Sequence, residues 1–260
     1  MRPQDTGEKM IDFHTHTLPG IDDGAKDSRT SIQMLQKEIE QGVKTLVFTP
    51  HYYGRKRSPE QFLQRRNAAF EKIKDSIPAQ LDVRLGSEVF FTGVNMASNE
   101  ELCSLAIEGT KYVLFEFPML GKWQNSVWES LSEFIHETDY TPIVAHVERY
   151  AETQKNPASV HRLIELGCLL QVNTTAFLDK CSQSFAFALL KHGLVHCLGS
   201  DSHDLQLRVC DYEQAKSVIC GKGYAKEFDE IQNNMRQILD GEYLTPQACT
   251  RLKKFLGRYY

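Results

Sequence analysis

The sequence predicts an α/β protein with the architecture of a TIM-like barrel, in which about seven strand–helix units follow one another. Segments rich in β-forming residues alternate with segments of helical periodicity, at spacings of roughly 25 to 40 residues. The chain has 260 residues and 41% hydrophobic content, which is enough for one barrel domain. We expect this domain to span residues 10–260. Residues 1–9 are polar and without pattern, so we expect a flexible extension there.

The first predicted strand, residues 10–16, places two histidines side by side. Ile11 and Phe13 alternate with polar residues, as is typical of a strand. Residues two apart share one face of a strand, so His14 and His16 point the same way at its end. An isolated pair of this kind is more often two solvated histidines than a metal site. The recurrence of histidines and carboxylates after the later strands favours the metal site.

The remaining elements are predicted from local signals. Runs of β-forming or apolar residues predict strands at 43–49, 81–89, 111–117, 142–147, 168–173 and 195–199. Capping residues, helix-opening prolines and apolar periodicity predict helices at 27–42, 58–75, 125–137, 157–166 and 183–191. Two or three helices are expected to finish the chain, the last from Thr245-Pro246 to Gly257. We expect Arg258, Tyr259 and Tyr260 to form an exposed, flexible tail.

Histidines and carboxylates occur near the ends of all but one of the predicted strands. In a barrel of parallel strands these ends converge on one mouth. The residues concerned are His14, His16, His51, Glu88, Glu116, His146, Asp201 and His203, with Asp23 on the first loop. Imidazole and carboxylate without cysteine suit zinc, manganese or iron. The set is larger than one ion needs, so we expect more than one metal ion and a bridging carboxylate.

Such a site suits phosphate chemistry. Three divalent cations facing four carboxylates would leave a net positive charge, which matches a phosphate dianion. Water bridging two such ions is a hydroxide near neutral pH and can attack phosphorus. Arg149, three residues after His146, and Arg208, five after His203, are expected to bind phosphoryl oxygens.

Several weaker expectations concern the surroundings of the mouth. The basic run of residues 55–57 could attract an anionic substrate, Tyr52 and Tyr53 could wall the pocket, and Asn173 could add a hydrogen bond. The remaining histidines, at helix positions or at a strand start, are interpreted as structural: His136, His161, His192 and His196.

Composition narrows the class of protein. A net charge of −4 and a pI near 6.1 argue against an electrostatic nucleic-acid binder. No apolar run approaches the ~18 residues of a membrane span and no signal pattern occurs, so we expect a cytoplasmic protein without membrane insertion. The seven cysteines form no CxxC pair, and none has arginine six positions later, which argues against a thiolate phosphatase. We expect them to be small, mostly buried thiols.

The motifs resemble those of the polymerase-and-histidinol-phosphatase (PHP) superfamily. More narrowly, the chain is similar to the bacterial PHP-type protein tyrosine phosphatases of capsule and exopolysaccharide loci (the CpsB/YwqE type). The similarity rests on DFHTHTLPGIDDGAKD, GSEVFFT, FEFP, VAHVERY, QVNTTAF and GSDSHD, and it extends from Met10 to about residue 245.

The resemblance implies a distorted (β/α)7 barrel with three divalent metal ions, usually manganese, with iron, zinc or magnesium as alternatives. One ion would be held by His14, His16, Glu88 and Asp201, a second by Glu88, Glu116 and His146, and a third by Asp23, His51 and His203. Arg149 and Arg208 match the family's phosphate-binding arginines. The implied substrate is phosphotyrosine, particularly on the C-terminal tail of a cognate tyrosine kinase that controls polysaccharide export.

Three other functions stay open at this point. A phosphatase of histidinol phosphate or another small phosphomonoester would use nearly the same metal site. A PHP-type nuclease would act on phosphodiesters, against which the acidic balance argues mildly. A scaffold with a structural metal cluster is the least favoured, since structural sites usually close around one ion with four ligands. The sequence does not define the oligomeric state.

Overall fold

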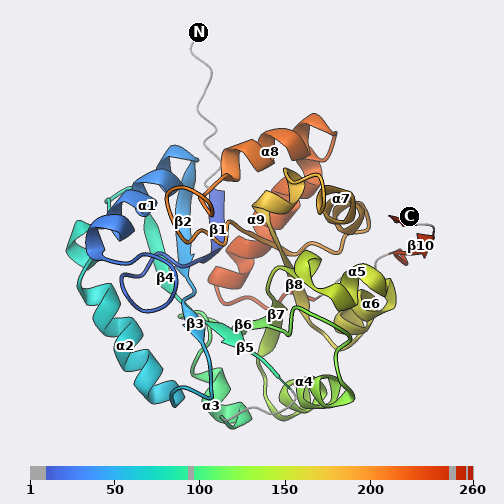
Figure 1. Cartoon of the computed structure of the whole chain (residues 1–260), viewed down its shortest axis with the longest axis horizontal. Coiled ribbons are helices and arrows are strands. Elements are labelled where there is room, and N and C mark those ends of the chain that lie inside the picture. The colour runs from blue at the N-terminus through green and yellow to red at the C-terminus, as the bar shows by residue number, and fades with distance from the viewer. Residues whose placement is uncertain (1–9, 93–96, 246–249, 256, 260) are drawn as a thin grey trace.

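The computed structural model describes residues 10–92, 97–245, 250–255 and 257–259. Its central strands are surrounded by helices in chain order, from α1 to α8 (Figure 1). The described strands are β1 Met10–Thr15, β2 Val43–Phe48, β3 His51–Tyr52, β4 Asp82–Leu85, β5 Glu88–Phe90, β6 Tyr112–Glu116, β7 Thr141–Val144, β8 Leu169–Asn173, β9 Cys197–Gly199, β10 Lys254–Phe255 and β11 Arg258–Tyr259. The described helices are α1 Ser28–Glu40, α2 Pro59–Glu71, α3 Asn99–Cys103, α4 Asn125–Glu137, α5 Ala151–Lys155, α6 Pro157–Glu165, α7 Gln183–Lys191, α8 Tyr212–Gly221 and α9 Ala225–Leu239.

The central strands form a curled parallel sheet in two hydrogen-bonded parts. Within the described residues one part has the strand order β1-β2-β4 and the other β3-β5-β6-β7-β8-β9. The chain passes from β2 into β3 and from β4 into β5 after two residues each, so the two parts continue one another. A parallel bridge joins Thr15 to Ser202, which places the segment after β9 beside β1.

The strand predicted at 43–49 is β2, which ends at Phe48, whereas the strand predicted at 81–89 is interrupted between β4 and β5, which corrects the expectation of a continuous strand there. Pro50 lacks the N–H that would continue the ladder after β2. Gly86 follows β4 and has no side chain to pack, which weakens a strand interior. As a consequence, Glu88 begins β5 instead of lying near the end of a strand.

The helices agree closely with the prediction. The helices predicted at 125–137 and 183–191 are α4 and α7 with the same bounds. Asp27 caps α1 by accepting a hydrogen bond from Thr30 N (2.8 Å), and Ser58 forms a capping box with Gln61 at the start of α2. The helix predicted to reach residue 75 ends earlier, at Glu71. In the described part of the chain, no helix has the length and apolar character that a membrane crossing requires.

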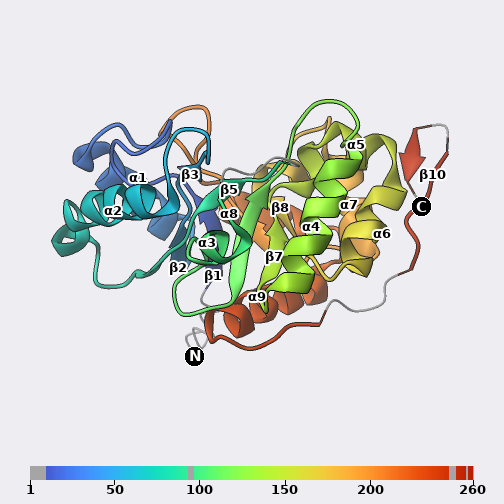
Figure 2. The same ribbon diagram turned by 90° about the horizontal axis from the view of Figure 1, so that it is seen from below.

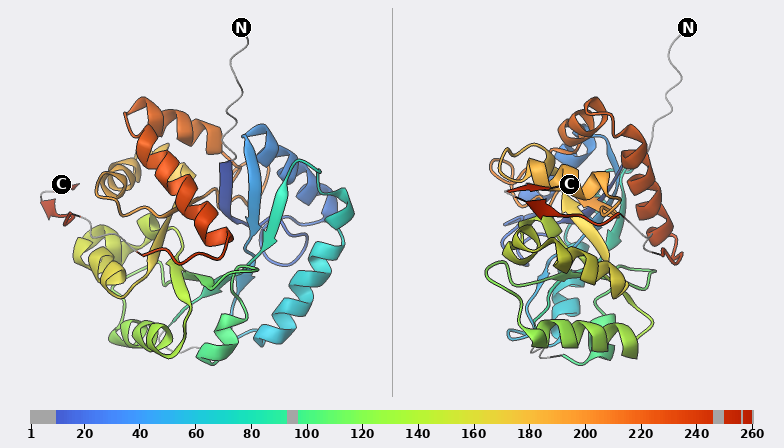
Figure 3. Two further views of the ribbon diagram at one scale, coloured as in Figure 1. Left: turned by 180° about the vertical axis from the view of Figure 1, so that it is seen from behind. Right: turned by 90° about the vertical axis from the view of Figure 1, so that its right-hand side faces the viewer.

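Helix α9 covers one side of the sheet. It runs beneath the strands in Figure 2 and crosses them in the left view of Figure 3. Ile11 N donates to Gln232 Oε1 (2.8 Å), which fixes α9 against the start of β1. The loops that follow β1, β6 and β9 lie on the opposite side, at the top of Figure 2. This opposite side, where the carboxyl ends of the strands open, is called the mouth below.

Aromatic packing joins the sheet to the surrounding helices. The ring of Phe115 on β6 stacks on Phe91 with centroids 4.5 Å apart and meets Phe134 of α4 edge-on at 5.0 Å. All three rings are fully buried. Truncating a core phenylalanine of this kind to alanine costs about 3–5 kcal/mol of stability. The strand that ends in Glu116 is therefore held rigidly.

The end of the chain differs from the prediction. The final helix expected to end at Gly257 is not formed over residues 250–255, because β10 pairs with β11 in an antiparallel hairpin. Gly257 supplies the positive φ of 78° that the turn requires. Tyr259 is half-buried and stacks on Phe185 with ring centroids 4.6 Å apart, so the expectation of an exposed tail is wrong for this residue. Residues 1–9, 246–249 and Tyr260 lie outside the described residues.

Candidate metal centre

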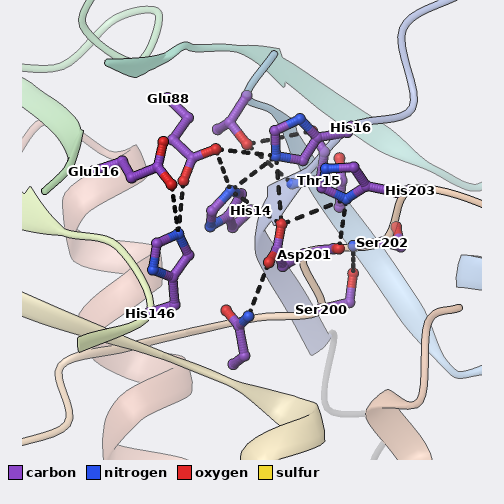
Figure 4. A network of polar contacts seen from close by, with 12 residues as sticks. His14, Thr15, His16, Glu88, Glu116, His146, Ser200, Asp201, Ser202 and His203 are labelled. Atoms are coloured by element: carbon purple, nitrogen blue, oxygen red, sulfur yellow. Dashed lines mark hydrogen bonds and ion pairs between the residues drawn. The ribbon is translucent and has the colours of Figure 1, made fainter. Parts of the chain in front are cut away.

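All residues predicted as metal ligands lie together at the mouth. Each has a nitrogen or oxygen atom within 3.7 Å of another member of the set. The set consists of His14, His16, Asp23, His51, Glu88, Glu116, His146, Asp201 and His203. Figure 4 shows the side chains from several strand ends pointing toward a common centre. The structure therefore brings the side chains predicted from the strand ends together in one place.

Glu88 occupies the middle of this cluster. It pairs in register with His51 across β3 and β5, and its Oε2 lies 2.9 Å from His51 Nδ1. The same oxygen lies 3.2 Å from His16 Nε2 and 3.3 Å from His14 Nε2. Its Oε1 lies 2.8 Å from His146 Nε2. A carboxylate whose two oxygens face different imidazoles is suited to bridge two cations.

Asp201 joins the cluster to the two predicted arginines. Its Oδ1 lies 3.4 Å from His16 Nε2. Its Oδ2 accepts hydrogen bonds from Arg208 Nη2 (2.7 Å), Arg149 Nη1 (3.0 Å) and Asn173 Nδ2 (2.9 Å). Both guanidinium groups are partly exposed, with 43% and 38% of their side chains accessible. The arginines therefore reach the site from the solvent side. Asn173, which was predicted to add a hydrogen bond, donates it to Asp201.

Asp23, His51 and His203 form a more exposed part of the cluster. Asp23 Oδ1 lies 3.5 Å from His51 Nε2 and 3.6 Å from His203 Nε2, and 65% of the Asp23 side chain is accessible. The His203 ring stacks on His16 with centroids 3.8 Å apart. His51 thus presents Nε2 to this group and Nδ1 to Glu88.

The donor atoms fall into compact groups that differ in part from the predicted ligand sets. The groups whose atoms lie within 4.8 Å of one another are His14, His16 and Asp201; His51, Glu88 and Glu116; and His16, Asp23, His51 and His203. The last group contains all three predicted partners, whereas the first lacks Glu88 and the second lacks His146. His16 also joins the Asp23 group, and His51 also joins the Glu88 group.

The donor chemistry fits cations better than a hydrogen-bond network. Glu88 Oε2 and His203 Nε2 are buried and have no hydrogen-bond partner of acceptable geometry among the described residues. His14 Nε2 and His16 Nε2 face each other at 3.1 Å, an arrangement in which two nitrogen lone pairs can converge on one ion. Buried polar groups normally have partners, so these atoms indicate that the cluster binds metal cations.

The pKa shifts of Glu88 and His203 favour the metal-binding forms of these two residues, whereas the pKa values of Glu116 and His16 are raised in the metal-free site. Burial opposes ionisation of Glu88, but the surrounding histidines, His14 foremost, hold its pKa well below the usual range. Burial and the neighbouring Glu88 charge raise the pKa of Glu116 to about 7. Burial and the charge of His16 lower the pKa of His203 to about 3. A neutral imidazole and an ionised carboxylate are the forms that bind metals.

Two residues of the site adopt backbone conformations that non-glycine residues rarely use. His146 has φ of 30° and Asp201 has φ of 54°. Each such conformation costs on the order of 1 kcal/mol and persists where surrounding structure enforces it. The strand predicted at 142–147 ends at Val144 for this reason, and the left-handed turn directs the His146 ring toward Glu88.

Asp22 is a functional residue that the sequence analysis missed. Its Oδ2 lies 2.8 Å from His16 Nδ1 and accepts a hydrogen bond from His51 N (3.0 Å). Burial opposes ionisation of Asp22, but the charge of His16 outweighs it and lowers the pKa of Asp22 to about 2. A carboxylate on the outer nitrogen of a metal-binding histidine fixes its tautomer and orientation. Asp22 and Asp23 are adjacent in one turn, and sequence offered no means of distinguishing their roles.

Gln171 and Asp12 support the site from below. Gln171 Oε1 accepts a hydrogen bond from His146 N (2.7 Å) and lies 3.2 Å from His14 Nδ1. Asp12 Oδ1 accepts hydrogen bonds from His14 N (3.1 Å) and Ser200 N (2.9 Å). The two-residue repeat of a strand could have indicated both residues. Asp12 lies two residues before His14 on β1, and Gln171 lies two residues before Asn173 on β8. Asp12, Glu38 and Cys210 form a buried group behind the centre.

The basic loop lies where it was expected. Lys56 and Arg57 line a cavity of about 430 Å³ together with Asp23, His51 and Tyr53. The Lys56 amine lies over the Tyr53 ring, 4.7 Å from its centroid. The loop therefore places positive charge beside the candidate metal centre.

Within the described residues, the other histidines and the cysteines belong to none of the donor groups at the mouth. His196 is buried and accepts a hydrogen bond from Leu170 N (3.1 Å), and His161 accepts one from Leu252 N (2.8 Å). Three of the described cysteines are buried: Cys168, Cys197 and Cys210. Cys181 is exposed and lines the cleft beside Arg149 and Arg208. Cys249 lies outside the described residues.

Comparison with known proteins assigns the chain to a family. The model of the family described as capsular polysaccharide synthesis, CpsB/CapC, matches residues 10–240. Tyrosine-protein phosphatase YwqE of Bacillus subtilis (strain 168) is 31% identical over 256 residues, which cover 95% of this chain and 99% of the relative. Tyrosine-protein phosphatase CpsB of Streptococcus pneumoniae is 29% identical over 244 residues, which cover 88% and 98%.

A solved structure shows the same fold. It comes from a study of YwqE from Bacillus subtilis and CpsB from Streptococcus pneumoniae, which are described there as metal-dependent tyrosine phosphatases. The TM-score is 0.80 at 26% sequence identity, and the match covers 94% of this chain and 100% of the other. The chain belongs to the CpsB/CapC family of capsular polysaccharide synthesis proteins.

Proposed function

We propose that this chain is a metal-dependent protein tyrosine phosphatase, which releases phosphate from phosphotyrosine. The observation that carries the proposal is the convergence of imidazoles and carboxylates on Glu88 and Asp201, beside two arginines. The names of the relatives support the same activity. Cys181, the exposed thiol among the described residues, lacks the arginine spacing of a cysteine phosphatase, since Phe187 lies six residues after it.

The proposed cofactor is a set of three divalent metal ions, manganese first, with iron, zinc or magnesium as alternatives. The proposed sets of ligands are His14, His16, Glu88 and Asp201; Glu88, Glu116 and His146; and Asp23, His51 and His203. When bound, the ions supply Lewis-acid chemistry, which activates the attacking water and neutralises charge on the phosphoryl group. Asp22 holds the outer nitrogen of His16 while that histidine binds its ion.

The two arginines are proposed to bind the phosphoryl oxygens. Arg149, Arg208 and Asp201 line one cleft of about 540 Å³, so a phosphate group there can reach both guanidinium groups. Each guanidinium has five N–H donors, of which Asp201 Oδ2 uses one from each. The other donors of each guanidinium can orient a phosphate through paired hydrogen bonds.

The leaving group explains why no proton donor is assigned to the reaction. The conjugate acid of a tyrosine phenolate has a pKa near 10, so the phenolate can depart without a dedicated general acid. An alkyl phosphate would leave as a far more basic alkoxide.

Three further proposals concern the fold, the location in the cell and the protein substrate. We propose that residues 10–260 form one distorted (β/α)7 barrel, which the bridge from Thr15 to Ser202 supports. The physiological substrate is proposed to be the tyrosine-rich C-terminal tail of a cognate bacterial tyrosine kinase in the cytoplasm, controlling capsular or exopolysaccharide synthesis. The family of this chain and the names of its relatives support this choice.

A substrate comparison tests the proposed activity. The protein is stripped with a chelator, given back manganese, and assayed for phosphate release from a phosphotyrosine peptide, histidinol phosphate and bis-p-nitrophenyl phosphate. We expect manganese-restored release that is fastest from the peptide. A preference for histidinol phosphate would identify a small-molecule phosphatase with the same site. Activity on the diester alone would favour a nuclease.

A further inference from the structure

We propose that Tyr53 and Phe90 form an aromatic wall that binds the phenol ring of the substrate and selects aryl over alkyl phosphomonoesters. This inference rests on the proposed function and adds to it the residues that recognise the ring. It starts from two aromatic rings that lie beside the metal donors and have no role in the proposed catalytic chemistry.

The wall lies one strand repeat beyond the metal donors. His51 and Glu88 pair across β3 and β5, and Tyr53 and Phe90 each lie two residues further toward the mouth. Residues two apart share a face and are separated by about 6.7 Å along a strand. In phosphotyrosine one ester oxygen separates the phosphorus from the ring, so the whole ring lies within this distance of the phosphorus. A phosphoryl group held at the level of His51 and Glu88 therefore places the ring at the level of Tyr53 and Phe90.

Ring contacts join the wall to the centre. The Tyr53 ring lies 5.2 Å from the His51 ring and 5.7 Å from the Phe90 ring, centroid to centroid. Both spacings lie within the range of favourable aromatic pairs. The three rings form a continuous path from a proposed metal ligand to the rim, and a substrate ring can extend this path by packing on Tyr53.

The two rings face open space. A pocket of about 270 Å³ is bounded by Tyr53, Phe90 and Leu102, and Tyr53 also lines the cavity that contains Asp23 and His51. Tyr53 therefore stands between the metal donors and an apolar pocket, with surface accessible from both. Phe90 lines the apolar pocket on the side away from the metal donors.

The charge around the wall selects an anionic substrate. Lys56 lines both spaces and lies over the Tyr53 ring, and Arg55 and Arg57 each line one of them. A substrate ring on Tyr53 would carry its phosphate toward the metals and any acidic neighbours in the peptide toward this basic rim. Histidinol phosphate carries an amine that this rim would repel.

The test compares the full-length, manganese-loaded protein with Tyr53→Ala, Phe90→Ala and Tyr53→Phe, and with Tyr243→Ala as a control at a remote, exposed tyrosine. Two peptides of one sequence carry phosphotyrosine or phosphoserine, and inorganic phosphate serves as a competitive inhibitor. We expect Tyr53→Ala and Phe90→Ala to raise KM for the phosphotyrosine peptide about three- to tenfold. The inhibition constant of phosphate should stay within twofold, and Tyr53→Phe and Tyr243→Ala should resemble wild type.

The outcomes separate this inference from the proposed function. If wild type hydrolyses the phosphotyrosine peptide while both alanine variants keep its KM and its preference over phosphoserine, the aromatic wall is wrong and the phosphatase stands. If wild type releases no phosphate from phosphotyrosine, both proposals fail together. Manganese content is measured for every variant. If Tyr53→Ala has lost metal, Phe90→Ala decides, since within the described part of the chain the Phe90 ring packs on Tyr53 and on no donor ring.

Discussion

Glu88 Oε1 lies 2.8 Å from His146 Nε2, and the two residues come from β5 and from the turn after β7. The His146 ring reaches this position only because its backbone is left-handed. The other oxygen of Glu88 faces His14, His16 and His51. One buried carboxylate thus connects histidines from three separate places in the chain.

Glu88→Gln removes the charge of this central carboxylate and keeps its shape. We expect loss of bound manganese and a fall in kcat of at least about 100-fold, because the amide cannot bridge two cations. Metal content and phosphate release from a phosphotyrosine peptide measure both effects. Glu133→Gln, an exposed change on α4, is the matched control. Normal metal content and turnover in Glu88→Gln would remove Glu88 from the centre.

Arg208→Lys keeps the charge beside Asp201 and removes the planar fork. We expect KM for the phosphotyrosine peptide and the inhibition constant of inorganic phosphate to rise together, about 10-fold or more, since paired hydrogen bonds to phosphate are lost. Manganese content should be unchanged. Arg251→Lys, an exposed arginine outside the mouth, is the control. A fall in kcat with phosphate inhibition intact would contradict a role in phosphate binding.

Asp22→Asn tests the positioning of His16. The amide leaves the imidazole without its carboxylate partner, so we expect manganese affinity to weaken by about 10- to 100-fold. Because Asp22 is not proposed as a ligand, excess manganese should restore most of kcat. Activity titrated against free manganese gives this readout. A loss that no manganese concentration restores would show that Asp22 acts directly in the centre.

His196 gives the folded chain a defined dependence on pH. Burial lowers its pKa from 6.5 to about 4. Between these values the unfolded chain binds a proton that the folded chain excludes, so stability falls as the pH is lowered from 6.5 and levels off below 4. This shift corresponds to roughly 3 kcal/mol. His196→Asn keeps an acceptor for Leu170 N and should lack this loss, as denaturant unfolding of the metal-free proteins at several pH values would show. Equal slopes in both proteins would contradict the assignment.

The sequence predicted the donors of the site because a simple rule governs them. Parallel strands bring their carboxyl ends together, so His14, His51, Glu116 and Asp201 could be placed at one mouth without knowing a single contact. The helices α4 and α7 were predicted with their bounds because capping signals and periodicity are local.

The misses have equally physical causes. The strand break at Gly86 depends on how neighbouring strands curl, which local sequence does not record. The choice between Asp22 and Asp23 depends on the direction in which a turn aims two adjacent side chains. The terminal hairpin depends on Tyr259 packing against Phe185, a contact between distant residues that local sequence does not record.

The central claim is a catalytic centre of three metal ions at the mouth. It is tested most directly by titrating the chelated protein with manganese while bound metal and phosphate release from a phosphotyrosine peptide are measured on the same samples. The account predicts three manganese ions per chain at full activity and no turnover without metal. One tightly bound ion per chain at full activity, or turnover that survives chelation, would contradict it.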